Sequence, residues 1–192
     1  MVALARFDAE GQWEETWVCD GLVRQNLAPT GVQFGRWPLR QLPDSAGLAA
    51  VQAAYAEELA DLGANFALHS ADRVALAPDD AHWPALRLQF LAEHRHGDAE
   101  IRFFLAGTGL FYLRSADGFL GLLCEAGEWV ALPAGLAHCF DAGEAPAFEA
   151  LRLFGRPQGW EAEPTGAVLP ALPLYDDFVV QLLEQVGEEL EG

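Results

Sequence analysis

Between residues 86 and 154 the chain alternates short apolar runs with turn-forming residues, and this pattern constrains the fold more than any other feature. The runs are rich in Leu, Phe and Val, and Gly, Asp or Pro stands between them. The pattern predicts strands at 86–96, 100–105, 110–114, 119–124, 128–132 and 147–154. Short strands at this spacing indicate a mainly β protein, built as a jelly-roll sandwich or barrel.

Two other stretches have helical spacing, with apolar residues every three or four positions. The first is 44–63, where Asp44 or Ser45 can cap the start of a helix. Gly63 is a candidate for its end. The second helix is predicted over 175–190, with one apolar face and several exposed glutamates.

The chain has 192 residues, of which 52% are hydrophobic, and this is enough for one sizeable core. We expect a single domain over 1–192 whose barrel core spans 86–155. Residues 1–85 should add short strands, mostly within 1–40, and the first helix. Four prolines after the core predict that 156–192 begins as a wrapping loop and ends in the last helix.

The net charge of −18 comes from 29 acidic residues against 11 arginines and no lysine. Such a surface repels the phosphates of nucleic acids and anionic membranes, so neither is an expected partner. An anionic small molecule would have to be held by a local cation or a metal, because the overall field opposes it.

Three cysteines, Cys19, Cys124 and Cys139, form an odd set with no Cys-x-x-Cys pair. Thiols of this kind suit a reducing compartment. The first residues contain no apolar leader segment, and no apolar run is as long as a membrane span. We therefore expect a cytoplasmic protein, and we expect it to be a monomer.

The segment 94–100 reads HRHGDAE and carries metal-binding residue types. On a strand, His94 and His96 point to the same face. Glu100 keeps that parity across a Gly-Asp bend, and His138 follows a Pro-x-Gly turn further along the chain. Three imidazoles and a carboxylate are a typical ligand set for Fe, Ni, Mn, Co, Cu or Zn. An isolated His-x-His pair is common on solvated strands, so the prediction depends on the full set.

Other catalytic patterns are absent from the sequence. The three serines, Ser45, Ser70 and Ser115, lie outside any G-x-S-x-G context. The segment 107–109 reads Gly-Thr-Gly but leads into another strand, so we expect a hairpin turn there instead of a dinucleotide site.

The two histidine segments resemble the two motifs of the cupin superfamily. The first reads H-x-H-x3-E-x6-G from His94 to Gly107, and the second reads G-x5-P-x-G-x2-H from Gly127 to His138. Leu88 and Ala142 replace a glycine and an asparagine that are usual in these motifs. Neither position is a ligand in the family.

Longer stretches resemble the acireductone dioxygenases more closely. These stretches are 90–113, 133–143 and 149–160, with a looser likeness at 27–37. Two departures are Cys139, where family members commonly have Trp, and the bulky Arg95 between the histidines. By strand parity both side chains should point away from the metal.

The resemblance implies an enzyme that cleaves 1,2-dihydroxy-3-keto-5-methylthiopentene with O2 in methionine salvage. It implies one Fe(II) or Ni(II) per chain. The Fe(II) form would yield formate and 2-keto-4-methylthiobutanoate, and the Ni(II) form would yield carbon monoxide, formate and methylthiopropanoate.

Further site residues follow from parity and from the resemblance. Arg102 should face the metal side, where it would pair with a substrate oxygen or a buried carboxylate such as Glu93, unless its strand face is solvated. Phe90, Phe140 and Trp160 are candidates for an apolar wall around the methylthio tail, although each could equally pack in the core.

Two other classes of function remain open. Another metal cupin, such as a flavonol dioxygenase or a sugar isomerase, would share the four ligands but not the Arg-Phe-Phe run at 102–104. A non-catalytic, ligand-binding cupin is the third reading. Metal analysis combined with O2 uptake on the acireductone separates all three.

Overall fold

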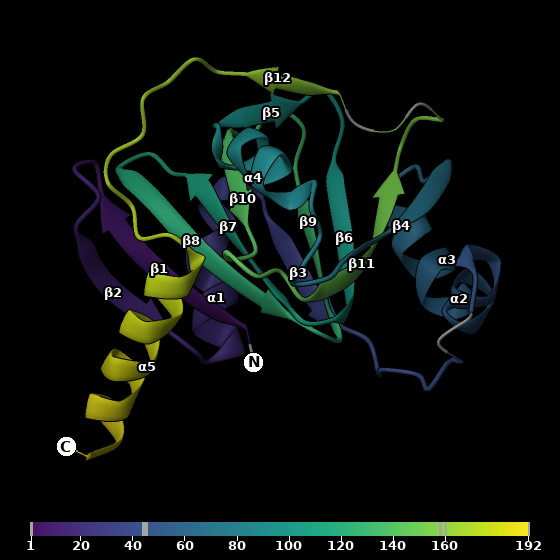
Figure 1. Ribbon diagram of the computed structural model, residues 1–192, viewed down its shortest axis with the longest axis horizontal. Coiled ribbons are helices and arrows are strands. Elements are labelled where there is room, and N and C mark those ends of the chain that lie inside the picture. Colours follow the sequence, from purple (N-terminus) through teal and green to yellow (C-terminus); the bar gives the residue numbers. More distant parts are fainter. Residues whose placement is uncertain (1, 44–45, 158, 160, 192) are drawn as a thin grey trace.

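Two antiparallel sheets pack face to face in the computed structural model of this protein, which confirms the predicted mainly β barrel (Figure 1). The structure describes residues 2–43, 46–157, 159 and 161–191. The larger sheet has the order β12-β5-β10-β7-β8-β1-β2, and the smaller has the order β3-β9-β6-β11-β4.

The strand bounds match most of the predicted strands. The larger sheet consists of β1 (Ala3–Asp8), β2 (Trp13–Trp17), β5 (His94–His96), β7 (Thr108–Arg114), β8 (Gly118–Glu125), β10 (His138–Asp141) and β12 (Ala162–Pro164). The smaller sheet consists of β3 (Gln33–Arg36), β4 (Ser70–Leu76), β6 (Glu100–Ala106), β9 (Glu128–Leu132) and β11 (Phe148–Phe154). The helical elements are α1 (Asp20–Leu27), the 3-10 turn η1 (Ala28–Thr30), α2 (Leu48–Ala54), α3 (Ala56–Asn65), α4 (Trp83–Leu91) and α5 (Tyr175–Glu191).

Many strands are apolar on both faces because both faces are covered. On β7, Phe111 and Leu113 point into the core between the sheets, whereas Tyr112 points outward against Phe178 of α5. On β6, Phe103 packs outward in the cluster that includes residues of α2 and α3. Full burial of a side chain of this size stabilises the fold by about 1.5–3 kcal/mol. The helices provide this burial for the outward side chains of the strands, so they are part of the core.

The turn between β6 and β7 confirms the predicted hairpin. Gly107 has φ +69, and a Cβ there would lie 1.8 Å from the carbonyl oxygen of Ala147. Only glycine can occupy this position without moving the backbone.

The N-terminal region is less purely β than predicted. Strands β1, β2 and β3 lie within 1–40 as expected, but residues 20–30 are helical. Val23 and Leu27, four residues apart, are both buried on one face of α1. This spacing is the helical signal that the turn-like Asp20-Gly21 pair obscured.

The predicted helix 44–63 is two helices, α2 and α3. They are divided at Tyr55, whose φ/ψ of −113/24 is not helical. Tyr55 is buried, and its hydroxyl accepts a hydrogen bond from the Arg40 amide. The second helix continues past Gly63 to Asn65, and the proposed caps at 44 and 45 lie outside the described residues.

The predicted strand 86–96 is wrong over its first half, which belongs to α4. Pro84 at the start of the helix fixes a helical φ. Trp83 is buried and donates from Nε1 to the carbonyl of Gly143 at 2.8 Å. These anchors outweigh the local alternation that suggested a strand, and they leave Leu88 73% exposed.

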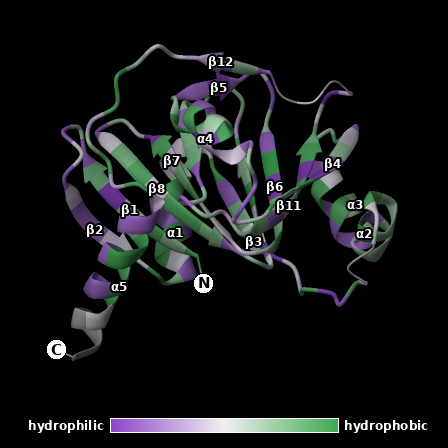
Figure 2. Ribbon diagram, viewed as in Figure 1, coloured by the Kyte–Doolittle hydropathy of each residue, from purple (hydrophilic) through white to green (hydrophobic). Residues whose placement is uncertain are grey.

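The C-terminal helix is confirmed as α5, and the loop before it contains one short strand. β12 pairs antiparallel with β5 and so joins the loop to the sheet. Figure 2 shows β5 as hydrophilic and β12 as mixed, at the end of the barrel that lies away from the two chain termini in Figure 1. No helix among the described residues is long and apolar enough to span a membrane.

Candidate metal centre

The four predicted ligand residues come together inside the barrel from three strands. His94 and His96 lie on β5, Glu100 begins β6 and His138 begins β10. The antiparallel pairing of β10 with β5 sets His138 directly opposite His94. All four side chains are buried, with at most 7% exposed.

One ligand atom of each residue points to a common centre. These four atoms all lie within 4.8 Å of one another. The Oε2 atom of Glu100 is 2.9 Å from Nε2 of His96 and 3.0 Å from Nε2 of His138. His94 and His96 share a face of β5, as strand parity predicts, whereas Glu100 comes from the smaller sheet, so the four side chains meet in the space between the two sheets.

Backbone carbonyls fix the orientation of all three imidazoles. Nδ1 of His94 lies 2.8 Å from the carbonyl oxygen of Ala92, and Nδ1 of His138 lies 2.9 Å from that of Leu136. Nδ1 of His96 lies 2.9 Å from the carbonyl oxygen of Glu161. A carbonyl oxygen can only accept, so each Nδ1 is the donor in these contacts, and each Nε2 points to the centre, where it can bind a metal in its neutral form.

Charge around the centre is arranged to keep Glu100 ionised. Burial alone would raise the pKa of Glu100. The positive charge of Arg102 and the hydrogen bonds of His138 and His96 outweigh that effect and hold this pKa well below its usual range. Glu100 is therefore a carboxylate at neutral pH.

The pKa values of two imidazoles move in opposite directions. Burial lowers the pKa of His94. Burial acts the same way on His96, but the hydrogen bond and charge of Glu100 outweigh it and raise the pKa of His96. The difference reflects contact, because Glu100 touches His96 directly.

This donor set fits a divalent transition metal. With all three imidazoles neutral and Nε2 unprotonated, three lone pairs and a carboxylate oxygen would repel one another in this buried space, and a cation at the centre would remove that repulsion. Nitrogen and oxygen donors in this ratio suit Fe, Ni, Co, Mn, Cu or Zn. The cluster could therefore hold one such ion.

A hollow of about 380 Å³ opens onto the cluster. Its polar lining includes His94, His96 and Arg102, and its apolar lining includes Phe90 and Pro164. A cavity of this size admits a small organic molecule beside the histidines.

Arg102 points inward, as its parity predicts. It is 5% exposed and donates from Nε to Oε1 of Glu100 at 2.7 Å. Its guanidinium also lies 4.4 Å from the ring centre of Phe140. The solvated alternative for Arg102 is therefore wrong, and its carboxylate partner is Glu100.

Glu93 does not pair with Arg102. It is buried at the edge of the hollow, where Oε1 accepts from Nε of Arg114 at 2.7 Å and Oε2 accepts from the hydroxyl of Thr165 at 2.5 Å. Thr165 belongs to the C-terminal loop, so Glu93 ties this loop to the sheet.

The aromatic candidates have different positions. Phe90 lines the hollow, but from α4 and not from a strand. Phe140 is 1% exposed in the core and stacks edge-to-face with Phe90 at 6.1 Å. Trp160 lies outside the described residues.

The two departures from the family motif face outward, as predicted. Arg95 is exposed between the two histidines. Cys139 is buried on the opposite face of β10, in the cluster that includes Phe178.

One charged residue of the hollow, Arg152 on β11, was not among the residues predicted from the sequence. Its signal was present in the run ALRLF at 150–154, where a single arginine interrupts an apolar strand. The register places Arg152 directly opposite Arg102.

A two-sheet barrel with three histidines and one glutamate directed inward from its strands defines a cupin with a mononuclear metal site. A family model described as "ARD/ARD' family" matches residues 44–162, and the chain belongs to this family.

Similar proteins agree with this family. Acireductone dioxygenase 1 of Nocardia farcinica is 42% identical over 164 residues, which covers 82% of this chain and 87% of the relative. Acireductone dioxygenase of Marinobacter nauticus is 41% identical over 157 residues, covering 81% and 85%. A solved acireductone dioxygenase from Bacillus anthracis, with a cadmium ion in its active centre, superposes with a TM-score of 0.74 at 24% identity, covering 85% of this chain and 98% of that one. At this identity the likeness concerns the fold.

Proposed function

We propose that this protein is a metal-dependent acireductone dioxygenase of methionine salvage. The substrate is 1,2-dihydroxy-3-keto-5-methylthiopentene, and the co-substrate is O2. The observation that carries the proposal is the convergence of three Nε2 atoms and one carboxylate oxygen within 4.8 Å, in a chain of this family.

His94, His96, Glu100 and His138 are the proposed ligands of one Fe(II) or Ni(II) per chain. All four offer their ligand atoms from rigid strands, and the three carbonyl contacts of the imidazoles hold each Nε2 in place. A divalent ion held there supplies Lewis acidity and a template for the two oxygens of an enediolate.

The side chains around the cluster orient the substrate. Arg102 offers a planar set of donors to an anionic oxygen at the wall of the hollow. Phe90, supported by Phe140, gives the methylthio tail an apolar surface. Fixing both ends of the molecule determines which carbons react with O2.

Arg102 also keeps the carboxylate of Glu100 in one position, since Nε holds Oε1 while Oε2 faces the histidines. The carboxylate of Glu100 thus stays ionised, and its Oε2 atom is directed at the proposed metal position. Glu93, held by Arg114 and Thr165, positions the adjoining chain of β5 and the C-terminal loop.

The reaction is balanced in either of two ways. With Fe(II), one O2 and one acireductone give formate and 2-keto-4-methylthiobutanoate. With Ni(II), the same reactants give carbon monoxide, formate and methylthiopropanoate.

We also propose that the enzyme works as a monomer in the cytoplasm, as a single domain. Cys124 and Cys139 are buried free thiols, which suits a reducing compartment.

The test is metal content together with O2 consumption. The purified protein should contain one Fe or Ni per chain and consume O2 when given the acireductone. Metal uptake without O2 consumption would instead favour a non-catalytic cupin.

A further inference from the structure

A row of charged side chains crosses the smaller sheet beside the four metal-ligand candidates. In the strand register, Arg102 of β6 lies opposite Arg152 of β11, and Arg152 lies opposite Asp72 of β4. Residues in register share a face of the sheet, so all three lie on the face that bears the hollow. Two like charges are therefore direct neighbours.

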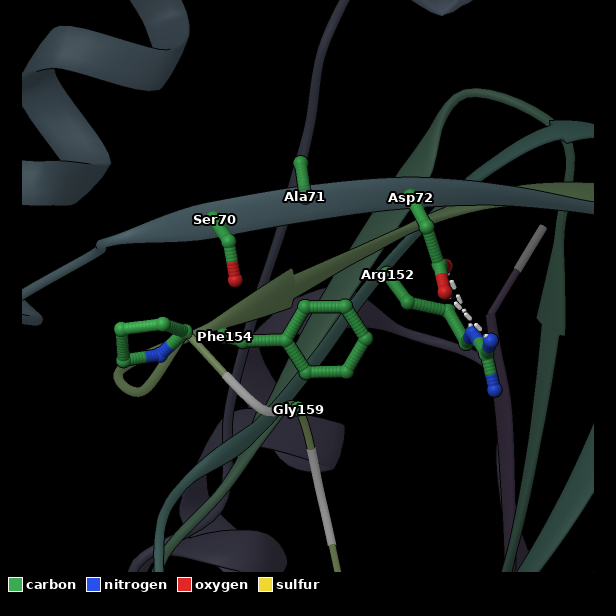
Figure 3. Close-up of a pocket in the computed structure, with 7 residues that line it drawn as sticks. Ser70, Ala71, Asp72, Arg152, Phe154 and Gly159 are labelled. Atoms are coloured by element: carbon green, nitrogen blue, oxygen red, sulfur yellow. Dashed lines mark hydrogen bonds and ion pairs between the residues drawn. The ribbon is translucent and has the colours of Figure 1, made fainter.

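Each arginine of this row pairs with a carboxylate. Arg102 donates to Glu100 at 2.7 Å. Arg152 donates to Asp72 through two nitrogens, at 2.7 Å from Nε and 2.5 Å from Nη2 (Figure 3). Burial is the main cause of a lowered pKa of the Arg102 guanidinium, and the positive charge of Arg152 acts on Arg102 and contributes to it.

Arg152 belongs to two adjoining hollows. It lines the hollow of about 380 Å³ together with His94, His96 and Arg102. It also lines an outer hollow of about 260 Å³ with Asp72 and Phe154, which Figure 3 shows. Its side chain is 32% exposed, whereas that of Arg102 is 7% exposed. Arg152 is therefore the outer cation of the site.

The charges of the site favour a ligand with two negative charges. With a divalent ion held by the four ligand residues, the ion and the two arginines would carry four positive charges, and Glu100 and Asp72 carry two negative ones. Glu93 lines the same hollow but is neutralised by Arg114. A positive surplus of two remains within a chain whose net charge is −18.

We propose that Arg152 binds the outer anionic oxygen of the substrate, and that Asp72 competes with the substrate for it. The inference rests on the proposed function and adds a second anion-binding residue to it. Before binding, Asp72 holds the guanidinium fork in position. When a dianion binds, Arg152 turns some of its N–H donors from Asp72 to the dianion. A neutral ligand of the metal does not attract these donors, so its affinity does not depend on Arg152.

The test compares two metal ligands that differ in charge. Oxalate is a chelating dianion, and imidazole is neutral. Calorimetric titration of the Ni(II)-loaded protein at low ionic strength gives the affinity for each, without any turnover. Arg152→Gln should lower the affinity for oxalate about tenfold, since a hydrogen bond to a charged group is lost. The affinity for imidazole should not change.

Two further variants give the sign of the effect. Asp72→Asn keeps an acceptor for Arg152 but removes the competing charge, so oxalate should bind several-fold more tightly. Arg152→Lys should recover part of the oxalate affinity, because Lys keeps the charge without the fork. Arg6→Gln is the control. Arg6 pairs with Glu14 and Glu15 on the larger sheet, and this substitution removes the same charge from the chain as Arg152→Gln does.

Equal oxalate affinity in wild type and Arg152→Gln would overturn the inference. So would an equal loss in Arg6→Gln, which would trace the effect to net charge. Weaker binding in Asp72→Asn would refute the competition. None of these results concerns O2 consumption, which tests the proposed function separately.

Discussion

Arg102 and Glu100 form a buried pair in which Nε of the arginine donates to Oε1 of the glutamate at 2.7 Å. The two residues are neighbours on the inward face of β6, so one strand supplies both a metal-ligand candidate and its counter-charge. The other carboxylate oxygen is thereby left to His96 and His138. This pair links the metal position to the substrate position.

Replacing Arg102 by Lys should separate these two positions. The variant should fold and keep its metal, because the charge beside Glu100 remains. Turnover should fall by about tenfold or more, since Lys lacks the planar fork that holds two oxygens. Steady-state O2 uptake and metal content measure the two effects, and Arg95→Lys is the matched control because Arg95 is exposed. Wild-type kinetics in Arg102→Lys would refute a role in substrate binding.

Loss of a single imidazole should empty the metal site. His96→Ala and His138→Ala should each lose most of the metal, because the three remaining ligands bind more weakly and in a distorted geometry. Elemental analysis after purification measures the metal content per chain. His82→Ala is the control, since that side chain is 89% exposed. Full occupancy in both cluster variants would show that the ligands are wrongly assigned. In the wild type, metal occupancy should fall as the pH drops below neutrality, because imidazole must be neutral to bind and the raised pKa of His96 makes it take up a proton before His94 does.

The three thiols should differ sharply in reactivity. Burial raises the pKa of Cys139 to about 12 and raises that of Cys124 well above its usual range, whereas Cys19 is exposed. A raised thiol pKa means that almost no thiolate exists at pH 8, and the thiolate is the reactive form. A thiol-reactive dye should therefore label only Cys19 in the native protein and all three cysteines after denaturation. Rapid native labelling of Cys124 or Cys139 would contradict this burial.

Asp141 should be a major stabilising residue outside the metal cluster. It is 1% exposed and accepts from Nε and Nη2 of Arg87 at 2.7 and 2.8 Å, and from the amides of Gly143 and Tyr175. These contacts join α4, β10 and α5. Asp141→Ala should lower the free energy of unfolding by about 3–5 kcal/mol, because it leaves Arg87 without its buried partner.

The control for Asp141→Ala is Glu14→Ala, which breaks an ion pair whose two side chains are each 44% exposed. That change should cost about 1 kcal/mol or less. Denaturant unfolding curves compare the two variants. Equal losses would mean that the contacts of Asp141 contribute no more than a surface pair.

The strands of the core were predictable from sequence because glycine and aspartate mark their turns, and Gly107 is the strongest example. The metal cluster was predictable because strand parity is a local property: His94 and His96 share a face, and the second motif supplies His138. The turns and the pair His94 and His96 needed only neighbours in sequence, whereas His138 came from the resemblance to the second cupin motif.

Other features depend on contacts between distant segments. Residues 86–91 alternate like a strand, but Trp83 and Arg87 are fixed by partners near residues 141–143, and these contacts select a helix. The position of Arg152 beside Arg102 depends on the pairing of β11 with β6, which are far apart in sequence. No local pattern contains that register.

The most direct test of the account is product identification after metal exchange. The protein is stripped of metal, reloaded anaerobically with Fe(II) or Ni(II), and given the acireductone with a pulse of O2. The account predicts formate and 2-keto-4-methylthiobutanoate from the Fe(II) form, and carbon monoxide with formate and methylthiopropanoate from the Ni(II) form. The absence of O2 consumption with either metal would contradict it.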